Sequence, residues 1–194
     1  MKEDTLYKIY RRRFQSVYGE YIALIGDKPE QILIEETNIL GHLAQYHNAT
    51  VISSKKEENL EKAFSHLSRA TLDLHKLVWA QITEMLHKYI VKNEKYITCF
   101  VHNEALTLSL YNEFLELGRK ARKGETNDIG VSPLRSSARY YKAINFGYDR
   151  LLRKFDEQKK AKLDSWIIKY KAKEYVIGFV LGFIANIIVA TIFS

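Results

Sequence analysis

The sequence predicts an all-α protein: a bundle of about four helices plus a long C-terminal helix that continues into a single transmembrane span. Apolar side chains recur at helical spacing along most of the 194 residues, and no segment shows the alternation typical of strands. Proline occurs only at Pro29 and Pro133, which permits long helices. The last twenty residues, Tyr175 to Ser194, carry no charged side chain.

The N-terminal region is expected to hold two helices separated by a tight turn. The first runs from about residue 3 to residue 24 and ends at Gly26 and Asp27. Pro29 suits the first turn of a second helix, which continues to about residue 47. The apolar face of the first helix consists of Leu6, Ile9, Tyr10, Phe14, Val17 and Tyr21.

A third and longer helix is expected between about residues 55 and 91. Apolar and small polar residues alternate spacings of four and three there, which forms a heptad seam and predicts an antiparallel hairpin with the second helix. The seam consists of Leu60, Phe64, Leu67, Thr71, Leu74, Val78, Gln81 and Met85.

The remaining chain is expected to hold two more helices. A fourth covers about 94–123, and turn-forming residues between 124 and 133 separate it from a last helix that begins near Leu134. We expect this last helix to run without a break through a basic stalk, 134–174, into the apolar end. The sequence then divides into a helical bundle (1–133), the stalk and a transmembrane helix (175–194).

The uncharged C-terminal run has the length of a membrane span, because twenty helical residues rise about 30 Å, the thickness of a bilayer core. A buried helix of a soluble core is the alternative. Gly178 and Gly182 form a GxxxG step, which predicts self-association into a homo-oligomer. Asn186 and Thr191 lie further along the run, and a pore lined by them is a hypothesis.

The segment before this run has the composition of a membrane interface. Between residues 150 and 173 there are nine Lys or Arg and three Asp or Glu, nearly the whole formal net charge of +7. The positive-inside tendency predicts a single-pass protein that contacts membrane lipid and has a cytoplasmic N-terminal domain. Nucleic acid is the rival partner for this basic stripe. The interface residues are Trp166, Lys169, Tyr170, Lys171, Lys173 and Tyr175.

Cys99 is the single cysteine, which excludes an intramolecular disulfide and a Cys-based zinc cluster and fits a reducing cytosol. His47, His87 and His102 have no partner at metal-ligand spacing, and no glycine-rich phosphate loop occurs. We therefore expect neither a metal nor a cofactor.

Two polar stripes are expected within the hairpin, each on one helix face. A hairpin that turns near residue 52 brings Glu35 near the level of Arg69, and His42 near that of His66. A charge-assisted network is one interpretation, and two solvated faces are the other. The stripes are Glu35, Asn38 and His42 on the second helix, and His66, Arg69 and Asp73 on the third.

Arg69 and His75, in the segment RATLDLH, have the spacing of a nuclease motif. It resembles the arginine, four to six residues, histidine motif of HEPN ribonucleases, which are helical proteins. The resemblance implies RNA cleavage without a metal, in which Arg69 stabilises phosphate charge and His75 transfers a proton. It also implies a site completed by a second protomer. A histidine packed beside the apolar seam is the other interpretation of His75.

The motif, the helical body and the apolar C-terminus together resemble the membrane-associated accessory proteins of type VI-B CRISPR systems. That resemblance implies an antiviral membrane pore that accompanies an RNA-guided, RNA-cleaving effector. Three functions stay open: an oligomeric pore-forming defence protein, a membrane-tethered HEPN ribonuclease, and a tail-anchored coiled-coil adaptor or fusion protein. The adaptor would bind a partner helix through Leu60, Leu67 and Leu74.

Overall fold

The computed structural model describes residues 3–127 and 132–192, with the side chains of the last helix described through residue 184. Apart from one isolated bridge, the regular structure in these ranges is helical, which confirms the all-α class. The elements are α1 (Glu3–Ile9), η1 (Tyr10–Phe14), α2 (Gln15–Ile25), α3 (Glu30–His47), α4 (Ser53–His87), η2 (Lys88–Lys92), η3 (Glu94–Cys99), α5 (Glu104–Asn127), α6 (Pro133–Arg150), η4 (Leu152–Lys154) and α7 (Glu157–Ile192).

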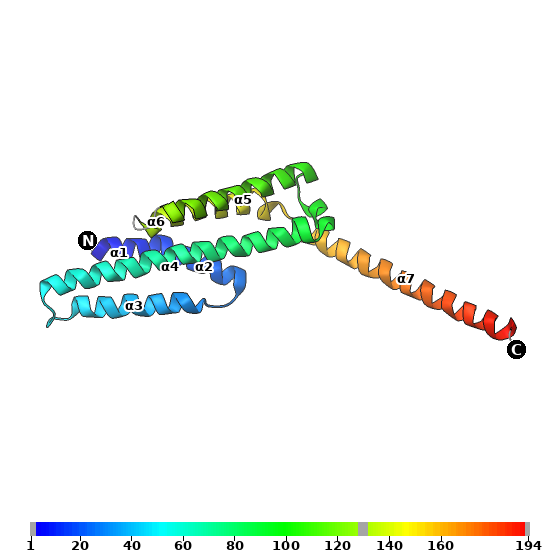
Figure 1. Ribbon diagram of the computed structural model, residues 1–194, viewed down its shortest axis with the longest axis horizontal. Helices are drawn as coiled ribbons and strands as arrows, with labels where there is room; N and C mark the ends of the chain where they lie inside the picture. The colour runs from blue at the N-terminus through cyan, green and yellow to red at the C-terminus, as the bar shows by residue number, and fades with distance from the viewer. Residues whose placement is uncertain (1–2, 128–131, 193–194) are drawn as a thin grey trace.

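Helix α4 is the axis of the bundle, and α2, α3 and α6 all pack against it, while α5 packs mainly on α6 (Figure 1). Its predicted seam faces inward: Leu67, Leu74 and Val78 are completely buried. α3 runs antiparallel to α4, as the sequence predicts. The apolar seam therefore forms the core of this protein's own bundle.

The first predicted helix is interrupted by a π-helical turn. In η1 the Gln15 N–H donates to the Tyr10 carbonyl, five residues earlier, so this turn holds one residue more than an α-helical turn. The predicted end of the helix is confirmed, since Gly26 takes the left-handed conformation with φ of 77°. Pro29 precedes α3 as expected.

Two predicted helices in the second half are shorter than expected. The segment 93–103 forms η3 and a turn instead of continuing a helix from residue 94. The last helix breaks between α6 and α7, where Phe155 forms a bridge with Phe100 and stacks on Tyr89 at 4.4 Å. Because α6 packs on α4 and α5, it belongs to the bundle, and the basic stalk begins only at α7.

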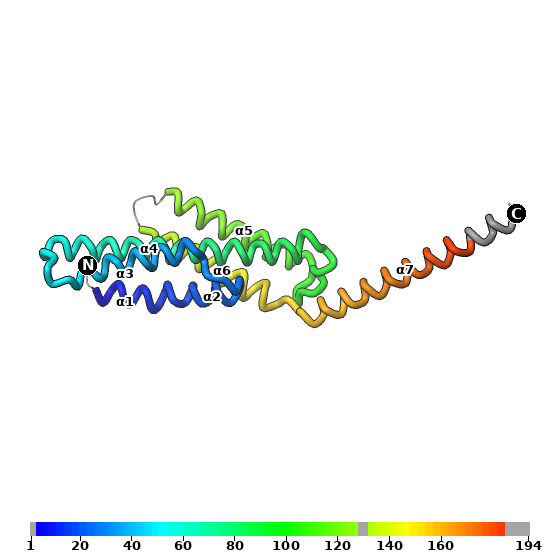
Figure 2. The backbone as a smooth tube through the Cα atoms, turned by 90° about the horizontal axis from the view of Figure 1, so that it is seen from below, coloured from blue at the N-terminus to red at the C-terminus, as the bar shows by residue number. Residues whose placement is uncertain are grey.

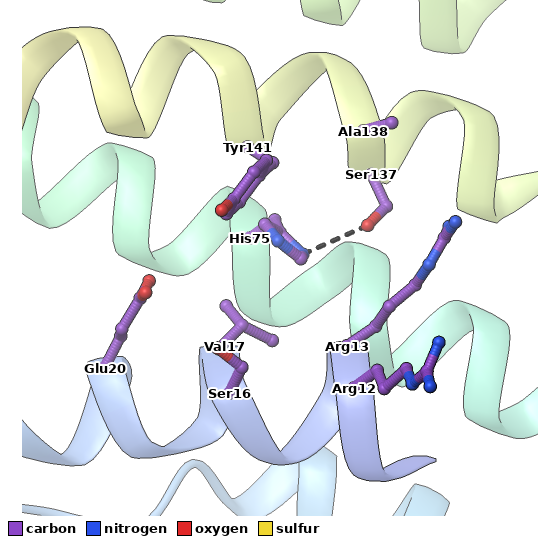
Figure 3. A pocket seen from close by; sticks show the side chains of 9 residues that line it. All are labelled: Arg12, Arg13, Ser16, Val17, Glu20, His75, Ser137, Ala138 and Tyr141. Atoms are coloured by element: carbon purple, nitrogen blue, oxygen red, sulfur yellow. Dashed lines mark hydrogen bonds between the residues drawn. The ribbon is translucent and has the colours of Figure 1, made fainter. Parts of the chain in front are cut away.

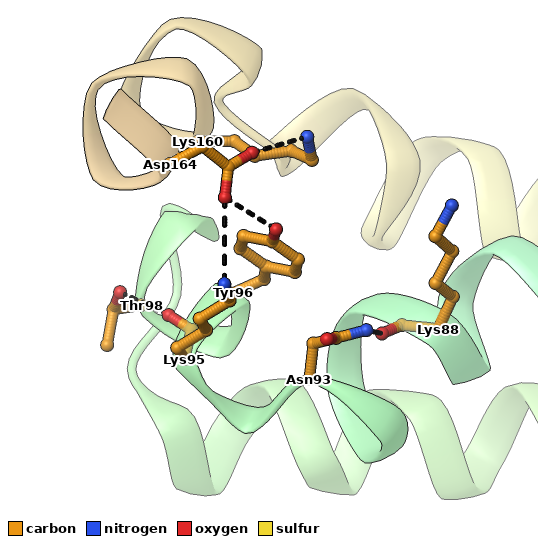
Figure 4. Close-up of polar contacts among 7 residues, drawn as sticks. All are labelled: Lys88, Asn93, Lys95, Tyr96, Thr98, Lys160 and Asp164. Carbon is orange, nitrogen blue, oxygen red and sulfur yellow. Dashed lines mark hydrogen bonds and ion pairs between the residues drawn. The ribbon is translucent and has the colours of Figure 1, made fainter. Parts of the chain in front are cut away.

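The start of α7 is held against η3 by a polar joint (Figure 4). The Asp164 carboxylate accepts a hydrogen bond from the Tyr96 hydroxyl at 2.6 Å and one from Lys160 at 3.0 Å. Lys95 lies 3.7 Å from the same carboxylate. Beyond this joint α7 extends away from the body, as both views show (Figures 1 and 2).

The predicted transmembrane span is wrong. None of the helices in the described ranges has both the length and the apolarity needed to cross a membrane. The part of the uncharged run with described side chains, 175–184, rises only about 15 Å, half of a bilayer core. The membrane location, with a single pass and a cytoplasmic N-terminal domain, is corrected with it.

The residues assigned to the membrane and its interface therefore need another description. A side chain at Gly178 or Gly182 would meet no other atom within 4 Å, and the side chains of Asn186 and Thr191 lie outside the described residues. No spanning helix supports the predicted pore. The predicted interface residues are exposed on α7, where Trp166 stacks on Tyr170 at 5.5 Å; the others are Lys169, Lys171, Lys173 and Tyr175.

Candidate functional site

A polar pocket of about 240 Å³ opens where the N-terminal helices, α4 and α6 meet (Figure 3). Three segments that are distant in the sequence supply its walls. It combines two guanidinium groups, an imidazole, a carboxylate and two hydroxyl-bearing side chains besides that of Ser16. The lining residues are Arg12, Arg13, Ser16, Val17, Glu20, His75, Ser137, Ala138 and Tyr141.

Local sequence explains why these side chains converge. Phe14 and Val17 are buried in the core and fix the orientation of η1 and α2. This leaves the exposed Arg13 and the half-buried Glu20, about two turns apart, on the pocket side. On α6, Ser137 and Tyr141 are four residues apart and so share one face. The longer turn of η1 makes Arg12 part of the same wall.

His75 forms the floor of the pocket, and its hydrogen bonds determine which ring nitrogen carries the proton. It is 5% exposed, and its Nδ1 lies 2.8 Å from the Thr71 carbonyl oxygen and 3.1 Å from Ser137 Oγ. A carbonyl oxygen can only accept, so Nδ1 must donate to Thr71. The neutral ring therefore has its lone pair on Nε2.

Nε2 keeps access to the pocket. In the described residues the fully buried side-chain nitrogen and oxygen atoms without a partner are Ser68 Oγ and Trp79 Nε1, and His75 Nε2 is not among them. No hydrogen bond is formed at Nε2 in this part of the chain. A proton acceptor thus lies within a cavity whose other wall carries Arg12 and Arg13.

The environment adjusts the protonation of the two acid–base groups in opposite directions. Burial lowers the pKa of His75; the bond to the Thr71 carbonyl opposes this, and the charge of Arg13 adds to the lowering. Burial raises the pKa of Glu20. At neutral pH His75 is therefore uncharged, and Glu20 holds its proton to a higher pH than an exposed glutamate.

Ser137 is not arranged as a nucleophile of the serine hydrolase type. Such a serine gives its proton to a bare imidazole nitrogen. Nδ1, the nitrogen beside Ser137 Oγ, already carries the hydrogen that it donates to Thr71. The Ser137 hydroxyl instead helps to hold the ring, and the Tyr141 ring contacts it edge-on at a centroid distance of 6.0 Å.

The structure separates the two residues of the HEPN-like motif. His75 lines the pocket, whereas Arg69 is exposed on α4 and is not part of the lining. Six residues rotate a straight helix by about 240° beyond one full turn, so the two side chains leave α4 in different directions. The arginines that do share the pocket with His75 come from η1.

The two predicted polar stripes meet only in part. Glu35 is 7% exposed and lies 2.5 Å from His66 Nδ1, and the His66 ring stacks on His42 at 5.3 Å. His42 also bonds to Asn59, at 2.9 Å, a residue that the stripes did not include. The other predicted members point elsewhere: Asn38 and Arg69 are exposed, and Asp73 pairs with Lys76.

Sequence reasoning missed most of the pocket. Arg12, Arg13 and Glu20 lie in the first helical segment, and Ser137 and Tyr141 lie more than sixty residues after His75. The one local signal is the run of three arginines, 11–13, beside an otherwise apolar helix face.

Comparisons with known proteins add no assignment: no family model, curated protein or solved structure matches the chain. The described residues contain no group of three or more His, Cys, Asp or Glu side chains that could hold a metal ion. The chemistry of the pocket must therefore be argued from its own side chains.

Proposed function

We propose that this protein binds a phosphodiester group of RNA in the pocket and cleaves it with the RNA's own 2′-hydroxyl as nucleophile. One observation carries the proposal: two guanidinium groups share a cavity with an imidazole whose Nδ1 is fixed and whose Nε2 is free. Guanidinium groups bind phosphate oxygens, and a fixed neutral imidazole is a general base.

The pocket suits a phosphate group and part of its ribose. Pockets for whole drug-sized ligands begin at roughly 300 Å³, and this one has about 240 Å³. A nucleobase would then remain at the mouth or outside. Arg12 and Arg13 give the pocket two positive charges against one carboxylate, that of Glu20, which is protonated over part of the pH range.

The proposed reaction is an in-line displacement at phosphorus. His75 Nε2 takes the proton of the 2′-hydroxyl as that oxygen attacks, which forms a P–O2′ bond and breaks the P–O5′ bond. Glu20 gives its proton to the departing 5′-oxygen. Arg12 and Arg13 stabilise the charge that develops on the phosphate oxygens. The products are a 2′,3′-cyclic phosphate and a 5′-hydroxyl end, and proton exchange with water restores both side chains.

Two other functions that the sequence left open are not carried forward. A pore or a membrane tether needs a spanning helix, and no helix in the described ranges qualifies. The coiled-coil adaptor would bind through Leu60, Leu67 and Leu74, yet each is at most 1% exposed inside the bundle. The ribonuclease, without a tether, is the alternative that the pocket supports. RNA is its proposed partner; a homo-oligomer stays a prediction.

The test is cleavage of a short fluorescent RNA by the purified full chain, compared with the same sequence as DNA and as 2′-O-methyl RNA. We expect cleavage of RNA alone, with a cyclic phosphate product. The double variant Arg12→Ala/Arg13→Ala should lower kcat/KM by about a hundredfold. Arg119→Ala, an exposed arginine on α5, is the matched control.

Arg69→Ala separates the pocket from the motif. If the motif arginine acts in catalysis, this variant loses as much activity as the double variant; if the pocket is the site, the loss stays within about twofold. The proposal is overturned if wild-type protein leaves RNA intact, or if 2′-O-methyl RNA is cut as fast as RNA.

A further inference from the structure

We propose that a second hollow beside the pocket is a subsite for the neighbouring nucleotide of single-stranded RNA. The hollow has a volume of about 470 Å³ and lies on the outer side of α1 and η1. It rests on the proposed function, because it extends the same substrate. Its lining residues are Asp4, Tyr7, Lys8, Arg11 and Arg12.

The two cavities are continuous through one side chain. Arg12 lines both the hollow and the pocket that contains His75. Lys8 lies four residues before Arg12, so it is about 6 Å further along the helix axis on the same face. A strand whose phosphate lies in the pocket therefore has a cationic path along one helical turn.

The charge of the hollow is complementary to a nucleic acid backbone. Lys8, Arg11 and Arg12 supply three positive charges, and Asp4 supplies one negative charge, which leaves +2. The three cationic side chains are exposed. The Asp4 carboxylate opposes phosphate at its own end of the hollow, so the favourable part is the side nearer the pocket. Cations that follow a backbone are typical of grooves for single strands.

An aromatic side chain next to these cations distinguishes the hollow from a simple basic patch. Tyr7 is 44% exposed and lines the hollow between Asp4 and Lys8 in the sequence. A base that stacks on an exposed aromatic ring gains about 1–3 kcal/mol without sequence preference. Bases in a duplex are already stacked and paired, so this contact selects a single strand.

The length dependence of cleavage is the main test. Wild-type protein should cut a single-stranded RNA octamer with a kcat/KM at least tenfold above that for a dinucleotide. Tyr7→Ala and the double variant Lys8→Ala/Arg11→Ala should each lower kcat/KM for the octamer about tenfold more than for the dinucleotide. Arg119→Ala/Lys120→Ala on α5 removes two exposed charges outside both cavities and should lower both equally, if at all.

Binding of a 2′-O-methyl RNA octamer, measured by fluorescence anisotropy, tests the subsite without cleavage. Each phosphate contact to a single strand contributes about 0.7 to the salt slope, so Lys8→Ala/Arg11→Ala should lower the slope by about 1.4. An acidic peptide of matched charge should bind more weakly. Equal binding of that peptide, together with no effect of Tyr7→Ala, would overturn the subsite.

The failures are distinguishable. If wild-type protein cuts neither the dinucleotide nor the octamer, the proposed function itself is wrong. If it cuts both at the same kcat/KM, and the variants at Tyr7, Lys8 and Arg11 do not separate them, the pocket acts alone and the subsite is wrong.

Discussion

Two histidines on α4, nine residues apart, have opposite surroundings. His66 is bonded to the Glu35 carboxylate and stacked on His42. His75 is bonded at Nδ1 to a backbone carbonyl and has a free Nε2 in a cavity with two arginines. A buried polar group whose bonding capacity is used contributes to stability and specificity of packing. A group with a spare lone pair beside mobile cations can act on a ligand.

This comparison teaches that a polar stripe along a hairpin is a poor guide to a reactive site. The stripe residues Glu35, His42 and His66 satisfy one another across the α3–α4 interface. The candidate site instead depends on long-range folding, because η1, α4 and α6 each supply part of it.

The largest expected effect is the loss of activity when each histidine is replaced by glutamine. His75→Gln should lower the cleavage rate by about 10²–10⁴-fold, because an amide cannot accept the 2′-hydroxyl proton. His66→Gln should leave the rate within about threefold, since His66 lies outside the pocket. The measurement is single-turnover cleavage of a short RNA.

Circular dichroism of both variants at the assay temperature is the control, since a rate means little if the chain has unfolded. Equal losses in folded His75→Gln and folded His66→Gln would move the site from the pocket to the α3–α4 interface.

The order reverses when stability is measured. His66→Ala leaves the Glu35 carboxylate, 7% exposed, without its partner, and should lower the free energy of unfolding by about 2 kcal/mol. The matched control is His47→Ala, which breaks a His47–Glu3 pair of similar length, 2.9 Å, at the surface. Exposed pairs contribute little, so the control should lose less than about 0.5 kcal/mol. Urea titration measures both, and equal losses would show that the buried network adds nothing.

The sequence predicted the parts of this molecule that depend on local pattern. The seam of Leu67 and Leu74 placed α4 and its inward face correctly, and Gly26 and Pro29 placed the turn before α3. Counting along a hairpin fixes the level of a residue only to within one turn. Glu35 therefore pairs with His66 rather than with Arg69, three residues later.

The sequence did not predict features that depend on distant contacts. The break before α7 reflects the bridge between Phe100 and Phe155, which are 55 residues apart and lie in segments of ordinary helical composition. The π-helical turn η1 has no local signature, yet Arg12 and Arg13 enter the pocket from it. The transmembrane prediction treated the apolar run as separate from the charged helix that it continues, and it was wrong.

The smallest expected effects concern pH, and they sharpen the contrast between a group that is protonated late and one that is deprotonated late. The lowered pKa of His75 means that the unfolded chain takes up this proton first as the pH falls below about 6.5. Stability therefore falls in the window just below that pH, and His75→Gln should remove this part of the slope. Urea unfolding at half-unit pH steps measures it.

Glu20 gives a slope of the opposite sign. Its pKa is raised in the fold, so its contribution to stability is complete below about 4.3 and is lost as the pH rises through the folded value. Glu20→Gln should remove that loss. The same two groups shape cleavage: His75 must be neutral and Glu20 protonated, so the rate should have an acidic optimum, with Glu20 responsible for the alkaline limb. If Glu20→Gln leaves that limb unchanged, another group protonates the 5′-oxygen, and if both variants change the stability slope in the same direction, the assignment of the two groups is reversed.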